Sequence, residues 1–248
     1  MKKLSILVVF LLFISASIFA QDWTRLQATA VVDVAVAENG YMAVVNRTGE
    51  LWTSRDAGAN WAKDAQATGV ARVSLNSNAS VIGIVNTSGE FWISRNMGTT
   101  WTKTQATGVV DASVGRSNTF IVNQTGEVWF SPDLNNWTRT NAQNMKVVIF
   151  GGPFIFLADK DGQSFIADFN GNSNMSYRRA QGTGVADMDV APNGRMWLVN
   201  TSGELWGASN SGATWNKDPQ ATGVAVVSTS NRYTIIANTS GEVWLKRN

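Results

Sequence analysis

The chain has 248 residues, among them 22 Gly, 11 Trp and 4 Pro, with no Cys and no His. Without Cys and His the sequence cannot form disulfides, the common zinc sites or any catalytic triad that uses histidine. The 20 Lys and Arg exceed the 18 Asp and Glu only through Lys2 and Lys3, so the charge indicates neither nucleic acid nor an anionic membrane as a partner.

The first residues of the chain have the pattern of a secretory signal peptide. Lys2 and Lys3 precede an uncharged, apolar run from Leu4 to Ala20, after which the sequence becomes polar. The run is shorter than the ~20 residues that a membrane-spanning helix needs. We therefore expect residues 1–20 to be a signal peptide cleaved near Ala20. The mature protein is expected to be secreted, extracellular or periplasmic, without membrane insertion.

The rest of the sequence consists of repeats. One motif recurs as NRTGELW (46–52), NTSGEFW (86–92), NQTGEVW (123–129), DKDGQSF (159–165), NTSGELW (200–206) and NTSGEVW (238–244). A second marker lies upstream of each, as in QATGV (66–70, 105–109 and 220–224). Six repeats of about 38 residues fill residues 21–248 and leave no room for a second domain.

Each repeat contains four short segments with strand character. In the second repeat these are residues 70–75, 81–86, 90–94 and 101–105, which are separated by polar or Gly-containing turns. Four antiparallel strands in each of six repeats predict an all-β fold, a six-bladed β-propeller.

The two ends of the repeat array complement each other. The last repeat stops at EVWLKRN and lacks the fourth strand, whereas residues 22–27 (DWTRLQ) match that strand in the other repeats. We expect the N-terminal strand to pair with the last blade and close the ring, which removes exposed sheet edges.

Two turn motifs recur between the predicted strands of the repeats. Asn and Gly in NTSG are typical of a tight turn, and an N-glycosylation sequon is the alternative. The segment SRDAGANW (54–61) has the spacing of an Asp-box turn, in which Ser54, Asp56 and Gly58 are expected to hold the backbone. Five of the six Glu follow the NTSG turn directly, which predicts a shared structural bond there and not catalysis.

The Trp residues form two sets. Those in the third strand of a blade, Trp52, Trp92, Trp129, Trp206 and Trp244, are expected in the core between blades. Those at the end of the Asp-box turn are expected either to pin the turn or to stack on a sugar ring. The candidate ligand-binding residues are these turn residues and the isolated Trp197: Trp23, Trp61, Trp101, Trp137, Trp197 and Trp215.

With its repeats aligned, the sequence resembles the tectonin family of β-propeller lectins. The resemblance rests on VADMDVAPNGRMWLVNTSGELW (185–206) and its relatives, and it spans residues 21–248. It implies recognition of surface glycans, including lipopolysaccharide and O-methylated sugars. The Trp that precedes LVN in this pattern occurs only at Trp197, so binding through that position would be confined to one blade.

The sequence leads us to expect a non-catalytic lectin that binds cell-surface glycans multivalently, with no cofactor and no metal. A propeller that binds protein partners within an exported assembly is the alternative. A sialidase-like glycosidase is disfavoured, since only three Tyr are present and nearly every Glu sits at the repeated turn. The one irregular segment, with Asp168, Tyr177, Arg178 and Arg179, is interpreted as drift or as a singular site.

Overall fold

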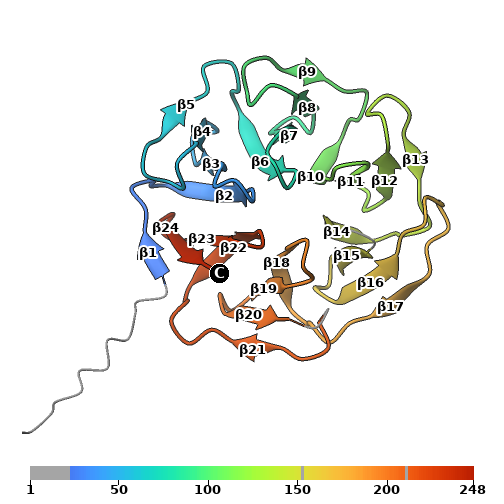
Figure 1. Ribbon diagram of the computed structural model, residues 1–248. Helices are drawn as coiled ribbons and strands as arrows, with labels where there is room; N and C mark the ends of the chain where they lie inside the picture. The colour runs from blue at the N-terminus through green and yellow to red at the C-terminus, as the bar shows by residue number, and fades with distance from the viewer. Residues whose placement is uncertain (1–22, 152–153, 210–211) are drawn as a thin grey trace, which may run out of the picture.

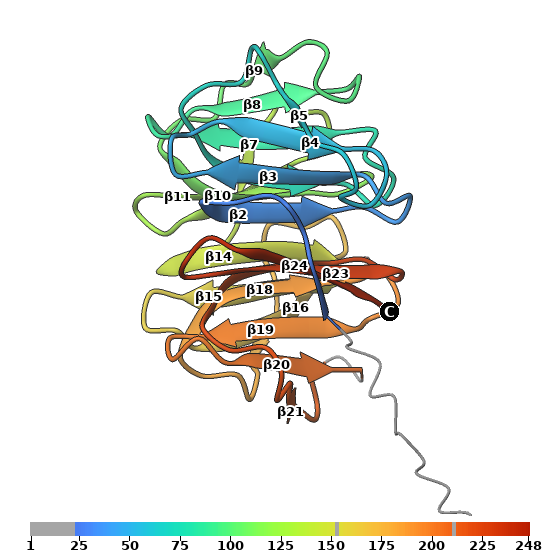
Figure 2. The ribbon, with the colours of Figure 1, turned by 90° about the vertical axis from the view of Figure 1, so that its left-hand side faces the viewer.

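The computed structural model describes residues 23–151, 154–209 and 212–248. They form six separate four-stranded antiparallel sheets arranged as blades around a central channel (Figure 1). Seen from the side, the strands run through the thickness of the disc (Figure 2). This confirms the predicted six-bladed propeller, whereas the predicted signal peptide at residues 1–20 lies outside the described residues.

The strands follow the repeats in chain order. Blade 1 contains β2 (Val31–Val36), β3 (Met42–Asn46), β4 (Leu51–Ser54) and β5 (Ala62–Lys63); blade 2 contains β6 (Val70–Leu75), β7 (Ile82–Asn86), β8 (Phe91–Ser94) and β9 (Thr102–Lys103); blade 3 contains β10 (Val109–Val114), β11 (Thr119–Asn123), β12 (Val128–Ser131) and β13 (Thr138–Arg139). Blade 4 contains β14 (Met145–Gly151), β15 (Phe154–Asp159), β16 (Ser164–Asp168) and β17 (Tyr177–Arg179); blade 5 contains β18 (Val185–Val190), β19 (Met196–Asn200), β20 (Leu205–Ala208) and β21 (Asn216–Lys217). Blade 6 contains β22 (Val224–Thr229), β23 (Tyr233–Asn238), β24 (Val243–Arg247) and the N-terminal β1 (Trp23–Arg25).

The ring is closed by the pairing of β1 with β24, as the sequence predicts. Trp23 lies opposite Lys246 and Arg25 lies opposite Trp244 in this antiparallel pair. The Arg25 guanidinium also lies 2.6 Å from Glu242 Oε1. The N-terminal strand thus takes the outer position that β5, β9 and their equivalents take in the other blades (Figure 1).

A belt of backbone hydrogen bonds explains why both sequence markers recur. In blade 2, Thr87 N–H donates to Gly69 O of the preceding connection at 2.8 Å. Val109 N–H of the following connection donates to Gly89 O at 2.9 Å. A Cβ on Gly89, whose φ is +75°, would lie 3.1 Å from the Cα of Gly108, so the close approach requires glycine. The same two bonds recur around the whole ring, including Val31 N–H to Gly241 O at the closure.

The core lies at the seams between neighbouring blades. At the seam of blades 3 and 4, for example, the Phe120 ring centroid lies 5.1 Å from that of Phe150 and 4.9 Å from that of Phe169. Burial of such rings supplies most of the driving force for packing sheet against sheet. Among the described residues, no helix is long and apolar enough to cross a membrane.

Candidate functional site

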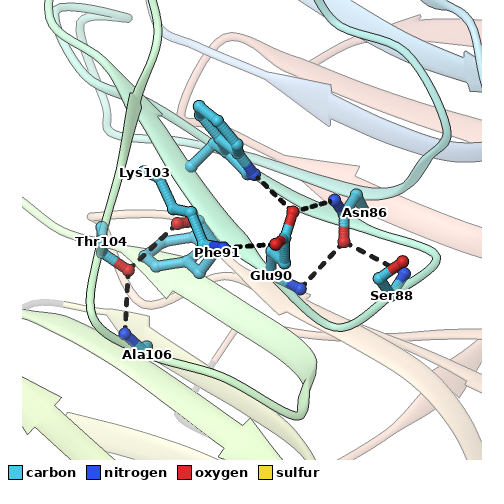
Figure 3. Close-up of polar contacts among 8 residues, drawn as sticks. Asn86, Ser88, Glu90, Phe91, Lys103, Thr104 and Ala106 are labelled. Carbon is cyan, nitrogen blue, oxygen red and sulfur yellow. Dashed lines mark hydrogen bonds and ion pairs between the residues drawn. The ribbon is translucent and has the colours of Figure 1, made fainter.

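The repeated Glu forms the structural bond that its spacing predicts (Figure 3). Asn86 Oδ1 accepts the backbone N–H groups of Ser88 and Glu90, and Asn86 Nδ2 donates to Glu90 Oε2 at 2.7 Å. The same Oε2 accepts the indole N–H of Trp92 at 3.3 Å, while Glu90 Oε1 pairs with Lys103. The carboxylate therefore ties the turn, the inner Trp and the outer strand together.

This arrangement keeps the repeated carboxylates ionised. Lys63, Asn46 and Trp52 donate to Glu50 and lower its pKa to about 2. In the same way Lys103, and then Asn86, lower the pKa of Glu90. A carboxylate held in this state cannot act as a general acid near neutral pH.

The Asp-box segment also uses its polar groups within the turn. Ser54 Oγ accepts Gly58 N–H at 2.9 Å and donates to Asp56 Oδ1 at 2.8 Å. Asp56 in turn accepts both the backbone N–H and the side-chain amide of Asn60, which lower its pKa to about 2. These bonds give Ser54, Asp56 and Gly58 the structural role expected from the sequence.

Three equivalent pockets lie beside the two Trp sets, in blades 1, 2 and 5. Their volumes are about 440, 410 and 380 Å³, respectively. Each is lined by one inner-strand Trp, one Asp-box Trp, the turn Asn and the connection that enters the blade. The paired Trp are Trp52 with Trp61, Trp92 with Trp101, and Trp206 with Trp215.

The pocket of blade 2 shows how these groups are brought together. Trp92 comes from the middle of β8, where the bond from its indole N–H to Glu90 holds the ring. Trp101 comes from the residue just before β9, and Gln66 and Thr68 come from the connection that leaves blade 1. The pocket therefore joins two half-buried aromatic rings to exposed amide and hydroxyl groups across a blade seam.

The inner Trp set packs against the core between blades, as expected from the sequence, but is not fully enclosed in it. Trp52, Trp92, Trp129, Trp206 and Trp244 each pack against a cluster at a blade seam and remain half-buried. Three of them line the pockets described above. The Glu two residues before each Trp was the available signal, because an indole N–H bonded to a surface carboxylate cannot be wholly buried between blades.

The indole N–H of the Asp-box Trp finds a partner only where the preceding blade supplies one. Trp101 Nε1 donates to Asp64 Oδ2 at 3.1 Å. Leu26 holds the position equivalent to Asp64 beside blade 1. The equivalent Asp-box glycines show this, because a Cβ on Gly58 would lie 2.7 Å from Leu26 Cδ1 and a Cβ on Gly98 would lie 2.9 Å from Asp64 Oδ2. Among the described residues, the buried Nε1 of Trp61 accordingly has no hydrogen-bond partner.

The other three candidate Trp residues occupy different environments. Trp23 is 5% exposed and donates to Asp218 Oδ2 at 3.2 Å. Trp137 is half-buried and packs edge-on against Phe91, with centroids 6.2 Å apart. Neither lines a pocket described here. Trp197 is 8% exposed and lines a separate pocket of about 340 Å³ between blades 5 and 6.

The central channel contains a second group of charged side chains. Asp33, Asp111, Asp187 and Asp189 project from the innermost strands, together with Arg72, whose Nη1 lies 3.9 Å from Asp33 Oδ1. Each innermost strand has a β-bulge near its start, as between Val31 and Asp33, which redirects the following side chain. The channel volume at this level is about 270 Å³.

The channel carboxylates bond the blades to one another. Asp33 Oδ2 accepts Val73 N–H of the next blade at 2.6 Å, and Asp187 Oδ2 accepts Val227 N–H at 2.7 Å. Burial raises the pKa of Asp33 to about 6 and, with the Asp33 charge nearby, that of Asp187 to about 8. Among the described residues, no group of three or more His, Cys, Asp or Glu could hold a metal ion.

The irregular segment lies within blade 4 and includes its outer strand. Tyr177, Arg178 and Arg179 form the exposed strand β17, and Asp168 ends β16. The Tyr177 ring packs edge-on against Phe165, with centroids 5.7 Å apart. No hydrogen bond or ion pair joins Asp168 to either Arg within the described part of the chain, and these residues line none of the pockets described here.

Comparison with known proteins shows the fold and not the family. No family model matches the chain, and no curated protein matches it. Solved structures that resemble it include a gluconolactonase from Xanthomonas campestris (TM-score 0.68, 12% identity, covering 90% of this chain and 87% of that one). They also include a chain of the mitotic checkpoint complex (TM-score 0.67, 13% identity, 99% of both chains) and YCF48 bound to D1 peptide (TM-score 0.63, 14% identity, 91% and 94%). These similarities place the chain among β-propellers, which include both enzymes and protein-binding proteins.

Proposed function

We propose that this protein is a lectin of the tectonin type, which is exported and binds surface glycans at several pockets without catalysis. The supporting observation is the recurrence of one pocket, built from two Trp of a blade and the polar connection that enters it, in blades 1, 2 and 5. The signal-peptide pattern in residues 1–20 supports export.

The chemistry of the pocket suits a pyranose ring. Half-buried indole rings offer flat apolar faces for the C–H face of a sugar, and they lose little conformational entropy on binding. In blade 2 the Gln66 amide and the Thr68 hydroxyl can bond sugar hydroxyl groups. Lipopolysaccharide and O-methylated sugars are suitable ligands, because a methyl group adds apolar area against the second indole.

Binding at several pockets on a rigid ring compensates for weak individual sites. Each pocket offers two indole rings and a few polar groups to a single sugar, so one site alone is expected to be weak. Several such pockets on one disc can engage a dense glycan surface together, which raises the overall affinity by about 10²–10⁴-fold. The overall affinity for a glycan surface would therefore come from avidity.

A non-catalytic role agrees with the state of the carboxylates that accept the indole N–H of the inner Trp at these pockets. Glu50, Glu90 and Glu204 each pair with a Lys of the outer strand and with a turn Asn. Glycoside hydrolysis commonly requires one protonated carboxyl group beside one ionised carboxylate. The repeated sites offer ionised carboxylates only.

A glycan array that includes methylated sugars and lipopolysaccharide fragments tests the proposal. Trp61→Ala combined with Trp215→Ala is expected to abolish most array binding. Trp137→Ala is the matched control, since Trp137 holds the same position in its repeat but lines none of the described pockets. Gln27→Ala with Gln181→Ala, exposed pocket residues whose loss should leave the fold intact, is expected to weaken binding as well. Wild-type protein that binds no glycan, or pocket variants that bind like wild type, would refute the proposal.

Peptide binding is the second candidate, favoured by the similarity to YCF48 bound to D1 peptide. It predicts that the chain captures a partner from secreted extract while the array stays negative. The pocket variants should then reduce capture of that partner, and addition of soluble glycans should not.

A further inference from the structure

The ring closure creates one pocket that differs from the repeated ones. It lies between blades 5 and 6, has a volume of about 340 Å³, and is lined by Trp197 of β19, Gly207 of β20 and Lys246 of β24 among others. Ser54, Ser94 and Ser131 occupy the position of Lys246 in other blades, where each serine holds an Asp-box turn. Blade 6 takes its outer strand from the N-terminus, so β24 needs no such turn and can carry a lysine.

The lysine is held in a fixed position at the bottom of the seam. Lys246 Nζ lies 5.6 Å from the centroid of the Trp23 ring and 5.9 Å from that of Trp197. It also lies 3.5 Å from Asp218 Oδ2, and the Lys246 side chain is 23% exposed. Contacts with two aromatic faces and one carboxylate hold the ammonium in place at the seam.

Among the described residues, the charged side chains that line this pocket carry an excess of positive charge. Asp218 is engaged by Trp23 Nε1, by Lys246 and by the backbone N–H groups of Gln220 and Ala221. Lys217, also in the lining, pairs with Glu204 at 2.6 Å.

Arg195 supplies the excess cation. It lines the same pocket and is half-buried, and its guanidinium has no ion-pair partner among the described residues. A guanidinium presents a planar pair of N–H donors that match a carboxylate.

The floor of the pocket is aromatic and carries an unused donor. Trp197 pairs across the strands with Gly207, and a Cβ on Gly207 would lie 2.8 Å from the indole ring. Glycine is therefore required for the ring to lie there. The buried Trp197 Nε1 has no hydrogen-bond partner within the described residues.

We propose that this pocket binds the carboxylate-bearing residue of an acidic glycan, a hexuronate, with the carboxylate at Arg195 and the sugar ring beside Trp197. That the ligand is a sugar rests on the proposed function, whereas its negative charge follows from the charges of this pocket alone. The repeated pockets, whose carboxylates are paired with lysines, have no equivalent unpaired cation. The ring would thus carry several sites for neutral sugars and one for an acidic sugar.

Two glycosides that differ only in the carboxylate test the proposal. Methyl β-glucuronide and methyl β-glucoside are titrated into the protein, and the indole N–H resonance of Trp197 is followed by NMR, assigned with Trp197→Phe. The glucuronide is expected to shift this resonance and to bind at least about tenfold more tightly than the glucoside there. Its affinity should fall as salt rises from about 0.05 to about 0.5 M.

Variants separate this site from the repeated pockets. Arg195→Gln is expected to weaken glucuronide binding about tenfold or more, with unchanged thermal unfolding. Lys63→Gln, the matched control that breaks the equivalent ion pair in blade 1, should change it less than threefold, and Trp61→Ala should not change it. Equal affinity for both glycosides, no binding of either, or an unaffected Arg195→Gln variant would overturn the proposal. Loss of array binding in the Trp61 variant with a retained glucuronide site would leave the proposed function supported independently.

Discussion

Replacement of Trp23 by alanine tests how much the ring closure contributes to stability. The Trp23 side chain is 5% exposed, packs in the cluster that contains Trp197 and Val224, and donates its indole N–H to Asp218. Truncation of a buried Trp to Ala costs about 3–5 kcal/mol, and loss of a donor to a buried carboxylate adds about 1 kcal/mol. We expect Trp23→Ala to lower the free energy of unfolding by about 5 kcal/mol.

Urea denaturation followed by far-UV circular dichroism measures this loss. In a domain of this size, about 5 kcal/mol corresponds to a fall in melting temperature of roughly 10–20 °C. Trp137→Ala provides the comparison: Trp137 has the same position in its repeat but is half-buried and lies away from the closure, so about 2 kcal/mol is expected. A loss below about 1 kcal/mol for Trp23→Ala, or one no larger than for Trp137→Ala, would refute the view that β1 locks the ring.

Removal of residues 21–27 should in addition expose the edge of β24 and produce concentration-dependent association.

Three further changes probe bonds within and between blades. Asp64→Ala should lower the free energy of unfolding by about 2 kcal/mol in urea denaturation, because it leaves the Trp101 indole N–H and two backbone N–H groups without an acceptor. Asp64→Asn should cost less than half of that. The free energy of unfolding should fall by about 1–3 kcal/mol between pH 5 and pH 8. The native protein binds protons at the channel carboxylates more tightly than the unfolded chain does, with the pKa of Asp187 raised to about 8. Asp187→Asn should flatten that pH profile. An unchanged profile would contradict the conclusion that Asp187 causes the pH dependence. Gly207→Ala should lose about 1–3 kcal/mol through collision with the Trp197 ring, measured by thermal unfolding, and no loss would show that the ring can move.

The fold was predictable because the sequence repeats. A turn such as NTSG and a connection such as QATGV recur at blade spacing, and both are required by the same belt of backbone bonds. The missing strand of the last repeat and its extra copy at residues 22–27 defined the closure as well. No pairing between distant strands had to be guessed, since every blade except the last is formed by consecutive segments.

The residues that line the repeated pockets were only half predictable. Trp61, Trp101 and Trp215 followed from the Asp-box spacing, but their pocket partners in the inner strands did not. A Trp in an apolar strand such as FWIS (β8) indicates a core position, and the bond from the Trp92 indole N–H to Glu90 shows that one edge of the ring also reaches the surface. The channel bond between Asp33 and Val73 and the pocket at Lys246 depend on which residues meet across a seam, which periodicity within a blade does not reveal.

The backbone belt has a consequence for how such a ring can diversify. The belt bonds join each blade to its neighbours through main-chain groups of one turn and two connections, so these bonds do not involve the side chains that line the pockets. Blade 4 illustrates this, because its turn keeps the belt bonds through Gly162 and Val185 although Gln163 replaces the repeated Glu. Pocket residues can therefore change blade by blade without breaking this belt, and one scaffold can present a different chemical face at each of its six positions.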